Sequence, residues 1–148
     1  MLKDILLELY DRDLTKLREE IELYSDEADL WKVGGDITNP AGNLCLHLTG
    51  NLKHFFGAVL GGTGYVRDRD AEFSAKNIAK SALLQDIDEA KSIVLATLAK
   101  LTDDDYAKTY PIEVFGKPMT TGFFLTHLAT HFNWHLGHIN YHRRLLRS

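Results

Sequence analysis

Five histidines near the C-terminus constrain the fold of this 148-residue chain more than any other feature of its sequence. They follow one another at intervals of 4, 4, 3 and 4 residues: His127, His131, His135, His138 and His142. On an α-helix, which turns by about 100° per residue, all five fall within an arc of roughly 80°. The spacing therefore predicts a C-terminal helix with a row of imidazoles along one face.

Apolar residues recur at helical spacing in three further segments: residues 2–24, 40–60 and 81–100. The first and third segments are amphipathic, with charged residues opposite the apolar stripe. The segment 40–60 is apolar on most sides and is expected to be buried. Together with the histidine-bearing helix, these segments predict an all-α fold, a four-helix bundle with long connections, as a single domain over residues 1–148.

Capping and turn residues indicate where the helices begin and end. Asn39 is expected to cap the segment 40–60, with proline in its first helical position. Thr120 or Thr121 is expected to cap the last helix, which runs to about residue 146. Residues 61–64, Gly-Gly-Thr-Gly, are typical of a helix C-cap and turn, because a phosphate-binding loop would end in Gly-Lys-[Ser/Thr]. Residues 101–118 are expected to form an extended piece or a small hairpin.

The composition argues against several classes of protein. A net charge of −4 gives no support for nucleic-acid binding. No apolar run approaches the roughly 18 residues that cross a bilayer, and the first residues lack the basic region of a signal peptide. Cys45 is the single cysteine of the sequence, which excludes an intramolecular disulfide and fits a reducing compartment. We therefore expect a cytoplasmic protein without nucleic-acid or membrane partners, in which Cys45 is a buried structural residue.

A single metal ion can use only part of the histidine row. The helix rises about 22 Å between His127 and His142, so the five side chains cannot share one ion. Two histidines four residues apart can reach the same ion, and a third ligand must then come from a facing helix. The segment 40–60 offers His47 and His54 for this purpose.

Residue types that are missing narrow the chemistry of such a site. The pair His131 and His135 has the spacing of a zinc-protease motif, but it lacks the glutamate that serves there as general base. Di-iron bundles need Glu-x-x-His pairs, whereas neither the segment 40–60 nor the C-terminal helix carries a carboxylate. A mononuclear site of three imidazoles with an open position remains, which suits zinc or nickel and disfavours magnesium or calcium.

The chain resembles the DinB-like superfamily, which includes YfiT-like metal-dependent hydrolases and thiol-dependent transferases. The resemblance rests on two strings, GNLCLHLTGNLKHFFGAVLGGTGYVRDRDAEF and HFNWHLGHINYHRR. It implies a bundle of up-down-down-up type, often homodimeric, with His47, His131 and His135 as metal ligands. His138 stands where many members have glutamine. No role follows from the resemblance for His54, His127 or His142.

Two features near this site leave alternatives open. Residues 67–70, Arg-Asp-Arg-Asp, are typical of a solvated loop, but the resemblance places this connection near the mouth of the bundle. An arginine there is a candidate to bind a carboxylate or a thiol cosubstrate. Trp134, nearly opposite the ligand pair on the helix, is expected in the core or at a dimer interface.

Three functions are compatible with the sequence. The first is a metal-dependent hydrolase or small-thiol transferase in stress or detoxification, acting on a thiol or an electrophile. No residue identifies its catalytic base. The second is a metal-binding stress protein without turnover. The third is a structural dimer whose histidines form a polar network between helices.

Overall fold

The computed structural model describes residues 1–146, and its regular structure in that range is helical, as predicted. The α-helices are α1 (Leu2–Glu22), α2 (Ala41–Leu52), α3 (Arg69–Ser74), α4 (Lys80–Lys100), α5 (Asp103–Ala107) and α6 (Thr121–Leu146). A 3₁₀ helix, η1 (Glu27–Trp31), follows α1, and a π-helix, η2 (Lys53–Leu60), continues α2 directly. None of the helices described within residues 1–146 is both long and apolar enough to cross a membrane.

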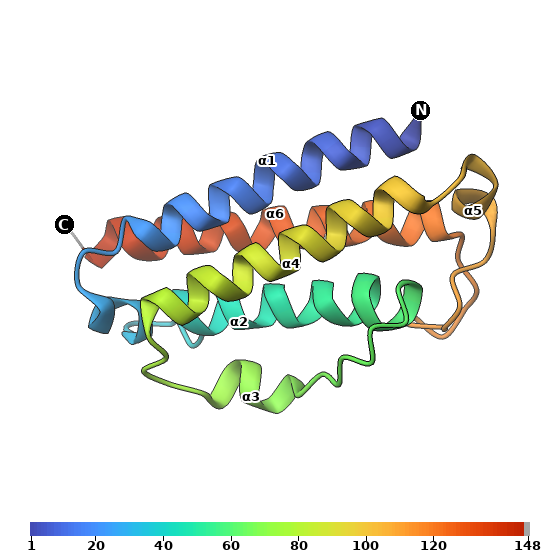
Figure 1. The fold of residues 1–148 in the computed structure, drawn as a ribbon. Coiled ribbons are helices and arrows are strands. Elements are labelled where there is room, and N and C mark those ends of the chain that lie inside the picture. The colour runs from blue at the N-terminus through green and yellow to red at the C-terminus, as the bar shows by residue number, and fades with distance from the viewer. Residues whose placement is uncertain (147–148) are drawn as a thin grey trace.

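Four long helices, α1, α2 with η2, α4 and α6, lie side by side (Figure 1). Helix α1 contacts α4 and α6, and α2 contacts the same two helices, so the apolar faces of all four meet in one core. The short helix α3 packs along α2, outside the group of long helices, and α5 lies at one end of it (Figure 1).

Helical periodicity explains how α1 and α4 contribute to the core. The buried residues of α1 include Leu6, Tyr10, Leu14, Leu17 and Ile21, and those of α4 are Leu83, Ile87, Ala90, Val94 and Leu98. Both series advance by three or four residues, which keeps them on one helical face. Burying each leucine or isoleucine contributes about 1.5–3 kcal/mol, so these two stripes account for much of the attraction between the helices.

Helix α2 is buried on nearly every side, as its composition predicts. Every residue from Ala41 to Leu52 except Leu46 is buried. The predicted cap was wrong by one position: Pro40 is the N-cap, in extended conformation, and its carbonyl accepts the first helical hydrogen bond from Leu44 N at 3.0 Å. Cys45 is fully buried as expected, and burial raises the pKa of its thiol.

The connections differ in part from the prediction. Residues 101–118 contain helix α5, whose capping box joins Thr102 and Asp105. The expected hairpin is limited to two backbone bonds, from Tyr110 N to Met119 O and from Thr121 N to Lys108 O, each 2.8 Å long. The predicted cap of α6 is correct, because Phe123 N donates to Thr120 Oγ1 at 3.1 Å.

Candidate metal centre

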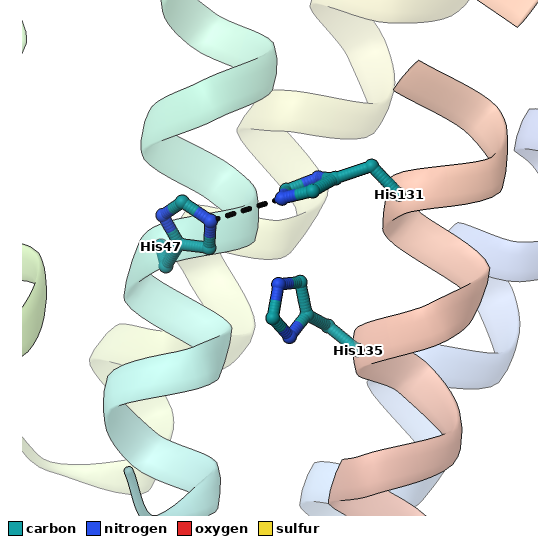
Figure 2. A group of neighbouring side chains, drawn as sticks. All are labelled: His47, His131 and His135. Atoms are coloured by element: carbon teal, nitrogen blue, oxygen red, sulfur yellow. Dashed lines mark hydrogen bonds between the residues drawn. The ribbon is translucent and has the colours of Figure 1, made fainter. Parts of the chain in front are cut away.

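Three histidines predicted as ligands meet between α2 and α6. His47 comes from α2, while His131 and His135 lie one turn apart on α6, and Figure 2 shows their rings turned toward one another. One nitrogen from each ring lies within 4.8 Å of the other two. The Nε2 atoms of His47 and His131 are 3.2 Å apart. The two helices thus bring together side chains that are 84 residues apart in the sequence.

This separation fits two ligands of one ion. With Zn–N bonds of 2.0–2.1 Å and a tetrahedral angle, two ligand nitrogens stand about 3.3 Å apart. Two further ring nitrogens, His131 Nδ1 and His135 Nδ1, are buried and have no hydrogen-bond partner within the described part of the chain. Buried polar atoms are nearly always satisfied, so the free nitrogen of His131 is expected to bind water, and that of His135 to bind water or an ion.

Burial keeps the two α6 histidines neutral. Desolvation, followed by the nearby imidazoles, lowers the pKa of His131 to about 4, and desolvation and His47 lower the pKa of His135 to about 4. Near pH 7 both rings therefore keep a lone pair. Neutral imidazole is the form that binds zinc, nickel or copper.

A carboxylate orients the third histidine. Glu72 of α3 is 5% exposed, and its Oε1 lies 3.0 Å from Nδ1 of His47. Since an ionised carboxylate can only accept, His47 donates from Nδ1 and presents its Nε2 lone pair to the other two rings. Burial opposes ionisation of Glu72, but hydrogen bonds from His47 and Arg67 outweigh it and hold the pKa of this carboxyl below its usual range.

Arg67 completes this polar cluster. Its Nε donates to Glu72 Oε2 at 2.8 Å and its Nη2 to Glu72 Oε1 at 3.0 Å, a bidentate pair. The two ligand-bearing helices carry no carboxylate, so their sequence gives no sign of Glu72, which reaches the site from α3. The alternative of a purely solvated loop at residues 67–70 is wrong for Arg67, whose side chain is 13% exposed.

One face of α2 is shaped to receive Glu72. Asn43 Nδ2 donates to the backbone carbonyls of Glu72 at 3.0 Å and Ala75 at 2.8 Å, which anchors α3. His47 lies one turn further along α2, and Gly50 follows it. A Cβ atom at Gly50 would collide with the Glu72 carboxylate, so glycine leaves room for this carboxylate against the helix.

The other histidines of the row lie in different surroundings. His142 is buried and bridges Tyr24 Oη, 2.6 Å from its Nδ1, and the carbonyl of Lys32, 2.8 Å from its Nε2. This role is structural, since it ties the end of α6 to the chain around η1. His138 is exposed. Trp134 is 67% exposed, so its predicted place in the core is wrong and the dimer interface remains a prediction.

The remaining two histidines, His127 and His54, also lie outside the three-residue cluster. His127, one turn before His131, packs edge-on against Phe115 with ring centroids 4.9 Å apart. His54 packs in the same manner against Phe55, at 4.7 Å. Neither belongs to the group of side chains that could hold one ion.

The fold and the site define an all-helical protein with a three-histidine cluster between two long helices. Residues 9–148 match a family described as "Protein of unknown function (DUF1572)", and the chain belongs to this family. The family is grouped in one clan with the DinB- and YfiT-like families. No curated protein matches the sequence.

We expect Gly50→Ala to weaken zinc binding although it changes no ligand. Alanine favours helix by about 1 kcal/mol over glycine, but here its methyl group displaces Glu72 from His47. Loss of such a partner typically lowers metal affinity by about 10- to 100-fold, and Glu72→Gln should behave similarly. Competition with a chromogenic chelator measures the affinity.

Gly137→Ala is the matched control, because a Cβ atom at Gly137 on α6 meets nothing within 4 Å. Its zinc affinity should equal that of the unmodified protein. Equal affinities for the Gly50→Ala variant and this control would contradict the role assigned to Glu72.

The metal-free protein should lose stability as the pH falls from about 6.5 to about 4. In this pH window the histidines of the unfolded protein bind protons, whereas His131 and His135 of the folded protein, with pKa values of about 4, stay neutral. Protonation therefore favours the unfolded state. Urea unfolding at several pH values measures the free energy of unfolding. A double variant, His131→Gln with His135→Gln, should show a shallower decline, and parallel curves for the two proteins would argue against the lowered pKa values.

Proposed function

We propose that this protein binds one zinc or nickel ion through His47, His131 and His135 and is a metal-dependent hydrolase or small-thiol transferase. The observation that carries the proposal is the convergence of three imidazoles whose ligand nitrogens lie within 4.8 Å of one another. An all-nitrogen donor set favours zinc or nickel over magnesium or calcium, which prefer oxygen. An ion held there supplies a Lewis acid that acidifies a water molecule or a thiol in its open position.

The protein's own side chains position one another at this site. Arg67 fixes Glu72, Glu72 fixes the ring of His47, and burial keeps the α6 pair deprotonated. Both carboxylate oxygens of Glu72 accept hydrogen bonds from these partners, so Glu72 serves as a positioning residue and not as the general base. No catalytic base is assigned.

The overall architecture supports the same proposal. Four long helices with a ligand-bearing second and last helix are what a DinB-like bundle of up-down-down-up type requires, and the family belongs to that clan. We extend the proposal to a homodimer, since α6 exposes Trp134 and Tyr141 at 67% and 65%. Aromatic side chains are enriched at protein interfaces.

A structural role is the second candidate, and one observation favours it. The 3.2 Å separation of His47 Nε2 and His131 Nε2 also suits a hydrogen bond between two neutral rings. On this interpretation the side chains of Arg67, Glu72, His47 and His131 form a hydrogen-bonded network that joins α2 to α6 without a metal. A metal-binding protein without turnover lies between the two readings.

Metal titration of untagged protein separates these functions. We expect one zinc or nickel ion per chain, and at 100-fold excess over Kd the ion should raise the free energy of unfolding by about 2.7 kcal/mol. His47→Ala and His131→Ala should abolish the effect, whereas His138→Ala, at an exposed position outside the cluster, should retain it. Absence of stoichiometric binding would leave the structural network as the function.

Assays of the metal-loaded protein then test catalysis. Activity with ester or amide substrates, or between electrophiles and small thiols, should be absent from His47→Ala. It should also be absent from unmodified protein stripped of metal and return when metal is added back. Activity that survives in this variant would contradict a reaction at the three-histidine site. Inactivity with both substrate panels would favour the metal-binding protein without turnover.

A further inference from the structure

A cavity of about 330 Å³ lies beside the three-histidine cluster. His47 and His131 form part of its wall, so a molecule in the cavity reaches the candidate metal site directly. The rest of the wall comes from α2 and η2, from Arg67 and the start of α3, from residues 114 and 115, and from the first turns of α6. Its volume is at the lower end of the range for small-molecule sites.

The charge of the cavity wall is positive. Arg67 and Arg69 both line it, and no aspartate or glutamate does. The charge of Arg67 is balanced by Glu72, behind the wall. Arg69 is exposed, and no carboxylate within residues 1–146 forms an ion pair with it. An exposed guanidinium group without a carboxylate partner, in the wall of a cavity that no acidic group lines, attracts anions.

The remaining wall is largely aromatic. Phe55 and Phe124 are buried and lie edge to face, with ring centroids 5.0 Å apart. Phe115 is 51% exposed, although it packs against both Phe124 and His127. An aromatic ring that is half in solvent at the wall of a cavity gains buried area when a ligand with an apolar body enters.

We propose that this cavity binds a small organic anion with an aromatic or apolar body. Arg69 holds the carboxylate or phosphate, Phe55, Phe115 and Phe124 enclose the body, and the far end of the molecule faces His47 and His131. The assignment rests on the proposed function in one respect: it makes this anion the substrate of the three-histidine site. Anion binding itself requires only the cavity and can be measured without metal.

Ligand titrations monitored by the amide resonances in NMR spectra test this assignment in metal-free and zinc-loaded protein. The probes are phenylacetate, phenylphosphate and the neutral phenylacetamide. We expect both anions to shift resonances of Arg69, Phe115 and His127 and to bind at least about tenfold more tightly than the amide, as a charge-assisted contact predicts. The tighter of the two anions identifies the headgroup.

Variants of exposed arginines provide the control. Arg69→Gln should lower the affinity for both anions by about 3- to 10-fold, the effect of removing one charged hydrogen-bond donor from a partly exposed site. Arg144→Gln removes another exposed arginine, which packs on Tyr141 of α6 and does not line the cavity, and should leave binding unchanged. Equal affinity for the amide and the anions, or an unchanged Arg69→Gln variant, would overturn the assignment.

Zinc titration of the same samples separates the two proposals. If zinc binds and neither anion does, the anion site is wrong and the metal site stands. If the anions bind metal-free protein with the predicted dependence on Arg69 and zinc does not bind, the cavity assignment stands and the proposed metal function fails.

Discussion

The candidate site depends on the hydrogen bonds that the buried carboxylate of Glu72 makes with His47 and Arg67. An ionised carboxylate is costly to bury unless its oxygens are paired, and here Arg67 and His47 supply the donors. The same contacts tie the loop after η2 and helix α3 to α2. Gly50 makes the approach possible, since a larger residue would exclude the carboxylate. The orientation of His47 is therefore a consequence of tertiary packing outside the two ligand-bearing helices.

Burial divides the histidine row of α6 into different roles. All five side chains share one helical face, but α2 lies opposite only part of it. His131 and His135 face His47 and stay neutral, whereas His142 reaches Tyr24 and a backbone carbonyl near η1. His138 faces solvent. The regularly spaced row thus supplies two members of the three-histidine cluster, and its other histidines make separate contacts. The cavity beside the cluster adds the positive charge of Arg69.

Much of the fold was predictable because long helices leave a periodic trace in the sequence. The apolar stripes located α1, α2 with η2, and α4, and the histidine row located α6, each to within a few residues. The short helix α3 and the π-helical turns of η2 left no such trace, since a six-residue helix has too few turns for a stripe and a widened turn keeps the apolar pattern. Glu72 was missed for the same reason. The positions of Asn43 and Gly50, on the His47 face of α2, were the available signal.

The proposed function requires that His47, His131 and His135 hold one metal ion. Anomalous diffraction from a crystal of untagged, zinc-loaded protein, recorded at the zinc edge, tests it most directly. We expect one strong peak between the three rings, about 2.0–2.1 Å from a nitrogen of each. A peak at His127, His138 or His142 instead, or intact contact between His47 and His131 with no peak beside them, would contradict it.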